Sequence, residues 1–133
     1  MIEYLYFSCG GYFSGTYTLQ LERKSGSIFF SRTAPYLYPP VTGRLTASRK
    51  VSAERYLSRL EDLGVENWQD EYINYHILDG TQWKLEYKTE GHELKKIIGD
   101  NEYPENWKEL NKIMDKLKEV VRREIAVTNK ADL

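Results

Sequence analysis

The sequence predicts an α+β domain in which an antiparallel β-sheet of about six strands, in the order βββα-βββα, has two helices packed on one face. Segments rich in aromatic and β-branched residues, broken by glycine turns, occupy residues 2–33 and 71–98. Each block is followed by a segment whose apolar residues recur at helical spacing. The 133 residues suffice for one core, so we expect a single domain over 1–133, with a frayed tail at 128–133.

The first predicted strand covers residues 2–8. Alternation places Leu5 and Phe7 on one face and the other apolar residues on the opposite face, namely Ile2, Tyr4 and Tyr6. A strand that is apolar on both faces is expected near the centre of a sheet, and Gly10-Gly11 should end it.

Residues 16–23 and 27–33 are predicted to pair as a hairpin across a turn at Lys24-Ser25-Gly26. The prolines within 34–40 exclude a helix and a central strand, because proline lacks a backbone donor and has a fixed φ. In the connection that follows, either a short strand lies around 44–46 or the segment is a loop.

A helix is predicted over residues 53–63, with Ser52 as its N-cap. Its apolar stripe consists of Tyr56, Leu57, Leu60 and Leu63. Gly64 should end the helix in a left-handed conformation, and Val65 and Trp68 should pack back against the helix end.

The second block begins with a predicted hairpin of residues 71–78 and 81–89, joined by Asp79-Gly80, a dipeptide that favours tight hairpin turns. Alternation in its second strand directs Trp83, Leu85 and Tyr87 toward the core. Residues 92–98 complete a meander, and their poor alternation indicates an edge strand or a bulge.

The last predicted element is a helix over 104–124 that begins at Pro104, where the missing amide costs nothing. We expect this helix and the second block to contribute jointly to one core. Its members should include Trp83, Leu85, Tyr87, Trp107, Leu110 and Leu117.

The second half of the chain resembles an uncharacterised family of small bacterial proteins. The resemblance covers roughly residues 52–121. Its motifs are an aromatic pair, Asp-Gly-Thr-Gln-Trp and Gly-x-Asn-x-Tyr-Pro-x-x-Trp, which correspond here to Trp68 and Tyr72, to 79–83 and to 99–107. No activity is established for that family, so the resemblance implies no catalytic residue, and the motif positions suit turns, core anchors and caps.

Composition and charge restrict the classes of function. The formal net charge is −1, so no overall field attracts nucleic acid or an anionic membrane. A single cysteine excludes an intramolecular disulfide, and no apolar run is long enough for a membrane helix. With no segment resembling a signal peptide, we expect a cytoplasmic location.

No pattern of residues indicates an enzyme, a metal site or a cofactor. Cys9 is expected to be a small buried residue, and the spacing of His76 and His92, both expected in strands, matches no metal motif. Gly10-Gly11 precedes a strand instead of the helix that a phosphate-binding loop needs.

The segment around residues 34–51 is the predicted partner-binding region. Its tyrosines flank a stiff proline backbone, and its basic residues have no acidic neighbour. The candidate residues are Tyr36, Tyr38, Arg44, Arg49 and Lys50. We expect a binding protein that acts by protein–protein contact, such as an accessory, immunity-type or phage-encoded inhibitory factor. The alternative is a nucleic-acid-binding module that uses the basic region 32–59, and self-association stays open.

Overall fold

The computed structural model describes residues 1–11, 15–35, 37–76 and 80–131. The elements in chain order are strands β1 (Ile2–Gly11), β2 (Gly15–Lys24), β3 (Ser27–Ala34) and β4 (Leu37–Arg44), helix α1 (Ala47–Glu61), the 3-10 helix η1 (Val65–Asn67), strands β5 (Glu71–Ile73), β6 (Thr81–Thr89) and β7 (Lys95–Asp100), and helix α2 (Trp107–Ala131).

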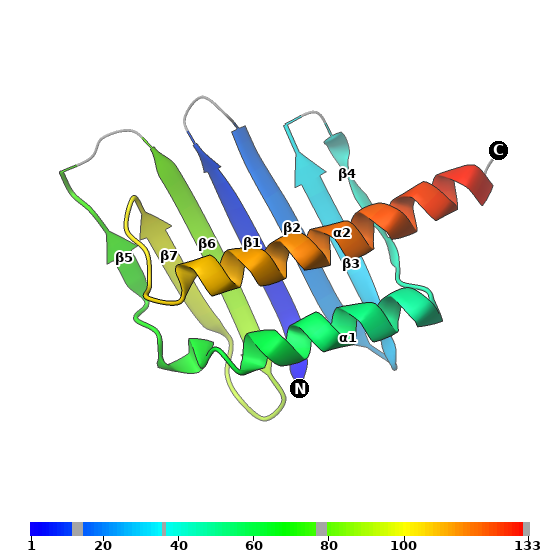
Figure 1. Ribbon diagram of the computed structural model, residues 1–133, viewed down its shortest axis with the longest axis horizontal. Coiled ribbons are helices and arrows are strands. Elements are labelled where there is room, and N and C mark those ends of the chain that lie inside the picture. Colours follow the sequence, from blue (N-terminus) through cyan, green and yellow to red (C-terminus); the bar gives the residue numbers. More distant parts are fainter. Residues whose placement is uncertain (12–14, 36, 77–79, 132–133) are drawn as a thin grey trace.

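The predicted α+β class is confirmed: one seven-stranded sheet carries two helices. The strand order is β4-β3-β2-β1-β6-β7-β5, and every neighbouring pair is antiparallel except β5 and β7, which are parallel. Both helices lie across the same face of the sheet (Figure 1). The core is therefore a single layer between the sheet and the two helices, and no helix formed by the described residues lies on the other sheet face.

The prediction that β1 is central is confirmed, but one side-chain direction was wrong. The register of β1 against β6 shifts between Ile2 and Tyr4. This irregularity turns Ile2 to the side of Leu5 and Phe7, and all three are buried. Tyr4 and Tyr6 are only half-buried and lie on the opposite face.

The connection after β3 contains a strand, but it lies earlier than predicted. β4 carries Pro39 and Pro40 and forms the outer edge of the sheet, where a missing amide breaks no pairing. The helix that follows starts at Ala47 instead of residue 53. Ser52 is thus inside α1, where its hydroxyl donates to the Ser48 carbonyl (3.4 Å), and it is not the N-cap.

The N-terminus of α1 is capped from a distant part of the chain. Thr46, its N-cap residue, makes no side-chain cap hydrogen bond, but its backbone amide donates to Glu124 Oε1 of α2. Glu124 is only 2% exposed. Beyond the C-terminal end of α1, the predicted left-handed conformation of Gly64 is confirmed by its φ of +68°. Val65 is fully buried, as predicted.

The predicted Asp79-Gly80 hairpin was wrong; Asp79 itself lies outside the described residues. β5 and β6 are not neighbours, because β7 lies between them. The strand after Trp68 ends at Ile73, since Asn74 Oδ1 accepts a hydrogen bond from the His76 amide (3.0 Å) in a local turn. Consequently β7 is not an edge strand, as its pairing with β5 covers its outer side.

Asn101, the first residue after β7, secures the start of β6. Its Oδ1 accepts from the Thr81 amide (2.9 Å), and its own amide donates to the Thr81 carbonyl (2.9 Å). The left-handed φ of +57° at Asn101 suits an asparagine. This pairing ties the start of β6 to the end of β7.

The motifs of the second half converge on one aromatic cluster. The ring centroid of Trp83 lies 4.7 Å from that of Trp107 and 5.9 Å from that of Tyr72. Tyr103 packs on Trp107 at 4.9 Å, and the Trp83 Nε1 donates to the Glu102 carbonyl (3.0 Å). Helix α2 begins at Trp107, so Pro104 is buried before it and does not open it.

A bidentate ion pair between Arg23 and Glu54 joins β2 to α1. Both terminal nitrogens of Arg23 donate to the carboxylate of Glu54, and its Nε donates to the Ile2 carbonyl (3.1 Å). These hydrogen bonds outweigh desolvation and lower the pKa of Glu54 below its ordinary value. The pair holds the middle of α1 against the sheet.

We predict that this pair makes stability fall in acid. Because the folded pKa of Glu54 is depressed, its contribution is complete above the unfolded pKa of about 4.3 and is lost as the pH falls through the folded value. Urea denaturation should show a shallower loss of stability below about pH 4 for Glu54→Gln than for the wild type. Parallel acid profiles for the two proteins would contradict this assignment.

Candidate functional site

The described side chains among the predicted partner-binding residues, namely Arg44, Arg49 and Lys50, are distributed over more than one element. Tyr36 lies outside the described residues, and Tyr38 belongs to the edge strand β4. Arg44 ends β4, whereas Arg49 and Lys50 lie in the first turn of α1. Lys50 Nζ donates to the Gly26 carbonyl in the β2–β3 turn, so it has a structural contact.

Arg44 instead belongs to the sheet face that carries no helix, which we call the open face. Arg44 pairs with Phe29, whose neighbours Ile28 and Phe30 are buried beneath the helices. Phe29 therefore points the other way and is 41% exposed. The strand register then places the remaining side chains of the open face.

Two cross-strand rows pass through the middle of the open face. The first runs from β4 to β6 as Arg44, Phe29, Glu22, Tyr4 and Lys88. The second runs from β4 to β7 as Thr42, Ser31, Gln20, Tyr6, Glu86 and Lys96. The two tyrosines thus lie side by side on the central strand.

The β2–β4 half of the open face is mostly uncharged and hydroxyl-rich. The row of Thr42, Ser31 and Gln20 carries small polar side chains, and so does the next row, which contains Thr18 and Thr33. The Thr18 and Thr33 hydroxyls hydrogen-bond to each other. The hydroxyl and amide residues of this half, together with Ser8 of the adjacent β1, are Ser8, Thr16, Thr18, Gln20, Ser31, Thr33 and Thr42.

The β6–β7 half is charged, but its charges are largely paired. Lys84 Nζ lies 3.2 Å from Glu86 Oε1, and Lys88 Nζ lies 2.7 Å from Glu3 Oε2. Glu86 also accepts a hydrogen bond from the Tyr4 hydroxyl (3.3 Å). Burial, followed by the nearby Glu86 carboxylate, raises the pKa of Tyr4 to about 12, so this hydroxyl stays protonated at neutral pH.

A hollow of about 350 Å³ lies on the open face beside Tyr4, lined also by Glu22, Lys88 and Leu94. Its wall includes exposed apolar surface, because Leu94 is 41% exposed.

The two sheet edges are poor sites for adding a further strand. β4 has two consecutive prolines at one edge, and β5 at the other edge has only three residues. Both features are typical of edges that resist pairing with another chain. A partner is therefore better accommodated on the open face than at an edge.

Cys9 lies in β1, whereas His76 and His92 lie on other elements of the chain. Cys9 is half-buried, and burial raises the pKa of its thiol, an effect that Lys118 opposes. His76 and His92 lie in exposed turns after β5 and β6, so their predicted location in strands was wrong. Within the described part of the chain, no three His, Cys, Asp or Glu side chains gather as a metal site.

Comparison with known proteins finds no family model, curated protein or solved structure that matches this chain. The resemblance to a family of small bacterial proteins therefore rests on the sequence motifs alone. Over the described residues, no helix is sufficiently long and apolar to cross a membrane.

The sequence reasoning missed the open face, although one signal was present. The sequence places Tyr4 and Tyr6 on an apolar face of a central strand, yet their cross-strand neighbours Glu22, Gln20 and Glu86 are polar. Large aromatic side chains among polar neighbours mark a surface that is only partly covered.

Proposed function

We propose that this chain is a non-catalytic cytoplasmic protein that binds a folded partner protein through the open face of its sheet. The observation that carries the proposal is the central Tyr4 and Tyr6 pair, with the exposed Phe29 two strands away in the row of Tyr4. Charged side chains flank these aromatic residues within the two rows, and hydroxyl and amide side chains occupy the rest of the β2–β4 half. Tyrosine with small polar residues is the chemistry of antibody combining sites, because it gives large contact area at low entropic cost.

The geometry also indicates the kind of partner surface. Beyond Glu22 and Arg44, the hydroxyl-rich half would leave a strongly charged partner group without a counter-ion, and such a group loses hydration without compensation. An uncharged, nearly flat protein surface suits this half. The paired charges of the β6–β7 half would form the rim.

The alternative, nucleic-acid binding through residues 32–59, is less well supported. The basic residues of that region point to different sides: Arg44 lies on the open face, Arg55 and Arg59 lie on α1, and Lys50 contacts a turn. A nucleic-acid site needs its cations along one continuous surface.

The proposal predicts that one face governs capture of the partner. We expect tagged wild-type protein to retain a specific protein from a lysate of its native host, identified by mass spectrometry. Phe29→Lys and Ser31→Lys, which place a cation on the open face, should reduce this capture at least tenfold, since the partner would have to cover the cation and remove its hydration.

The matched control is Ser58→Lys, the same substitution at an exposed position of α1, which should leave capture unchanged. Circular dichroism checks that each variant is folded. Equal capture by all three variants, or no retained protein with the wild type, would overturn the proposal. Self-association that Phe29→Lys abolishes would also contradict it, by assigning the open face to a second copy of the chain.

A further inference from the structure

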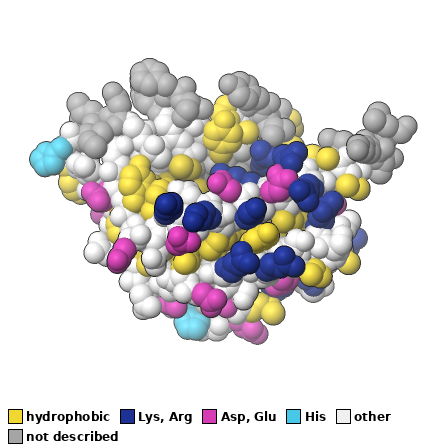
Figure 2. Space-filling view, viewed as in Figure 1, with side chains coloured by type: hydrophobic (Ala, Val, Ile, Leu, Met, Phe, Trp, Pro, Cys, Tyr) yellow, Lys and Arg dark blue, Asp and Glu magenta, His cyan; other side chains and the backbone are white. Residues whose placement is uncertain are grey.

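The helix layer carries most of the protein's positive charge. Helices α1 and α2 together contain 11 Lys and Arg and 6 Asp and Glu residues, a formal charge of +5, whereas the whole chain is at −1. The remainder of the chain is therefore at −6. In the space-filling view, Lys and Arg side chains lie along both helices on either side of a hydrophobic strip (Figure 2).

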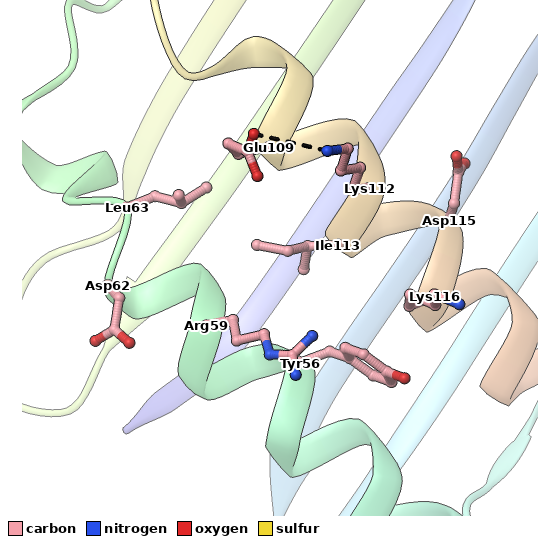
Figure 3. Close-up of a pocket in the computed structure, with 9 residues that line it drawn as sticks. All are labelled: Tyr56, Arg59, Asp62, Leu63, Glu109, Lys112, Ile113, Asp115 and Lys116. Atoms are coloured by element: carbon pink, nitrogen blue, oxygen red, sulfur yellow. Dashed lines mark ion pairs between the residues drawn. The ribbon is translucent and has the colours of Figure 1, made fainter.

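A groove of about 620 Å³ lies between the C-terminal half of α1 and the N-terminal half of α2. Tyr56, Leu63 and Ile113 supply its apolar surface, and the latter two lie between the helices (Figure 3). Three cations line the same groove, namely Arg59, Lys112 and Lys116. The Arg59 guanidinium also lies 5.4 Å from the ring centre of Tyr56.

Three acidic residues, Asp62, Glu109 and Asp115, line the groove beside its three cations, so the excess of positive charge lies in the surrounding helix layer. Asp62 and Asp115 point away from the centre, and the Glu109 carboxylate lies 3.9 Å from Lys112 Nζ (Figure 3). Other helix carboxylates have partners elsewhere: Glu54 binds Arg23, Glu61 lies 3.2 Å from the Met1 amine, and Glu119 binds Arg122 and Arg123. Arg59 and Lys116 thus border apolar surface near the centre of a basic layer.

We propose that this groove binds an acidic, amphipathic segment of a partner protein. Apolar side chains of the segment would cover Leu63, Ile113 and Tyr56, and its carboxylates would pair with Arg59, Lys112 and Lys116. A helix or extended segment that presents acidic residues beside apolar ones matches both features, as in other helix-in-groove complexes. The site lies on the helix side of the sheet, so it is separate from the open face.

A protein segment fits the groove better than a nucleic acid does. Glu109 and Asp115 lie among the cations of α2 and would repel consecutive phosphates. A phosphate backbone is hydrated along its length and has no apolar group that could cover Leu63 and Ile113. Carboxylates spaced along a helix can avoid the two acids while their apolar neighbours enter the groove.

The test uses a fluorescein-labelled peptide with leucines on one helical face and glutamates beside them, and fluorescence anisotropy measures its affinity for the full chain. We expect saturable binding that weakens roughly tenfold with Lys116→Glu and with Arg59→Glu. A peptide with its leucines replaced by serine, and another with its glutamates replaced by lysine, should each bind at least tenfold more weakly.

The control variant is Lys96→Glu, which makes the same charge change at an exposed position of β7 on the open face and should alter the affinity less than about twofold. Equal weakening by Lys96→Glu and Lys116→Glu would show unspecific charge attraction and would overturn the proposal. No peptide binding up to about 1 mM would also overturn it. Tighter binding of a DNA oligonucleotide than of the peptide would assign the basic layer to nucleic acid instead.

Discussion

Replacing Gly99 by alanine is expected to destabilise the protein by about 3 kcal/mol, because the new methyl group would collide with a fixed indole ring. A Cβ at this position would stand 2.0 Å from both Cε2 and Nε1 of Trp83. The ring cannot move away, since Nε1 donates to the Glu102 carbonyl and Trp107 packs at 4.7 Å. Urea denaturation measures the change in the free energy of unfolding.

The neighbouring Ile98→Ala variant is the control, because Ile98 is 42% exposed on the other face of the same strand and should cost less than about 1 kcal/mol. A double variant that combines Gly99→Ala with Trp83→Leu should be more stable than the sum of the two single effects, since the smaller side chain removes the collision. A Gly99→Ala protein as stable as the wild type would refute the close contact.

Replacing Glu124 by alanine is expected to cost about 2–3 kcal/mol, which combines the loss of a charged hydrogen bond with the loss of a helix cap. The carboxylate is 2% exposed and accepts from the Thr46 amide at the start of α1. Thr46 itself makes no side-chain cap hydrogen bond that could replace this one. The thermal midpoint should fall by roughly 10 °C.

Two further variants separate the cap from other effects. Glu124→Gln retains an acceptor oxygen but loses the charge, so it should recover about half of the lost stability. Glu119→Ala removes an exposed carboxylate from the same helix, where its ion pairs with Arg122 and Arg123 should contribute little. Equal midpoints for Glu124→Ala and Glu119→Ala would refute a capping role for Glu124.

The parts of the fold that the sequence predicted depend on residues close together in the chain. The stripe of Leu57 and Leu60, the left-handed Gly64 and the inward alternation of Trp83, Leu85 and Tyr87 all appear in the structure. Each follows from a period of 2 or 3.6 residues or from the backbone freedom of one glycine. The same logic located β1 at the sheet centre.

The candidate sites were harder to predict from the sequence, because they depend on which elements become neighbours in the fold. The groove needs Leu63 beside Ile113, and the open face needs Phe29 in register with Arg44. Neither relation has a local sequence signal. Of the predicted partner-binding residues, only Arg44 has a described side chain on the proposed docking surface.

The sequence by itself determined the class of elements, their approximate extents and the composition of the core. The tertiary structure alone decided that β7 lies between β5 and β6, that Glu124 caps α1 across 78 residues, and that one sheet face remains uncovered. Local periodicity sets the direction of side chains within one element. The choice of neighbouring elements depends on packing and hydrogen bonds between residues far apart in the chain, such as Trp83 on Gly99 and Asn101 on Thr81.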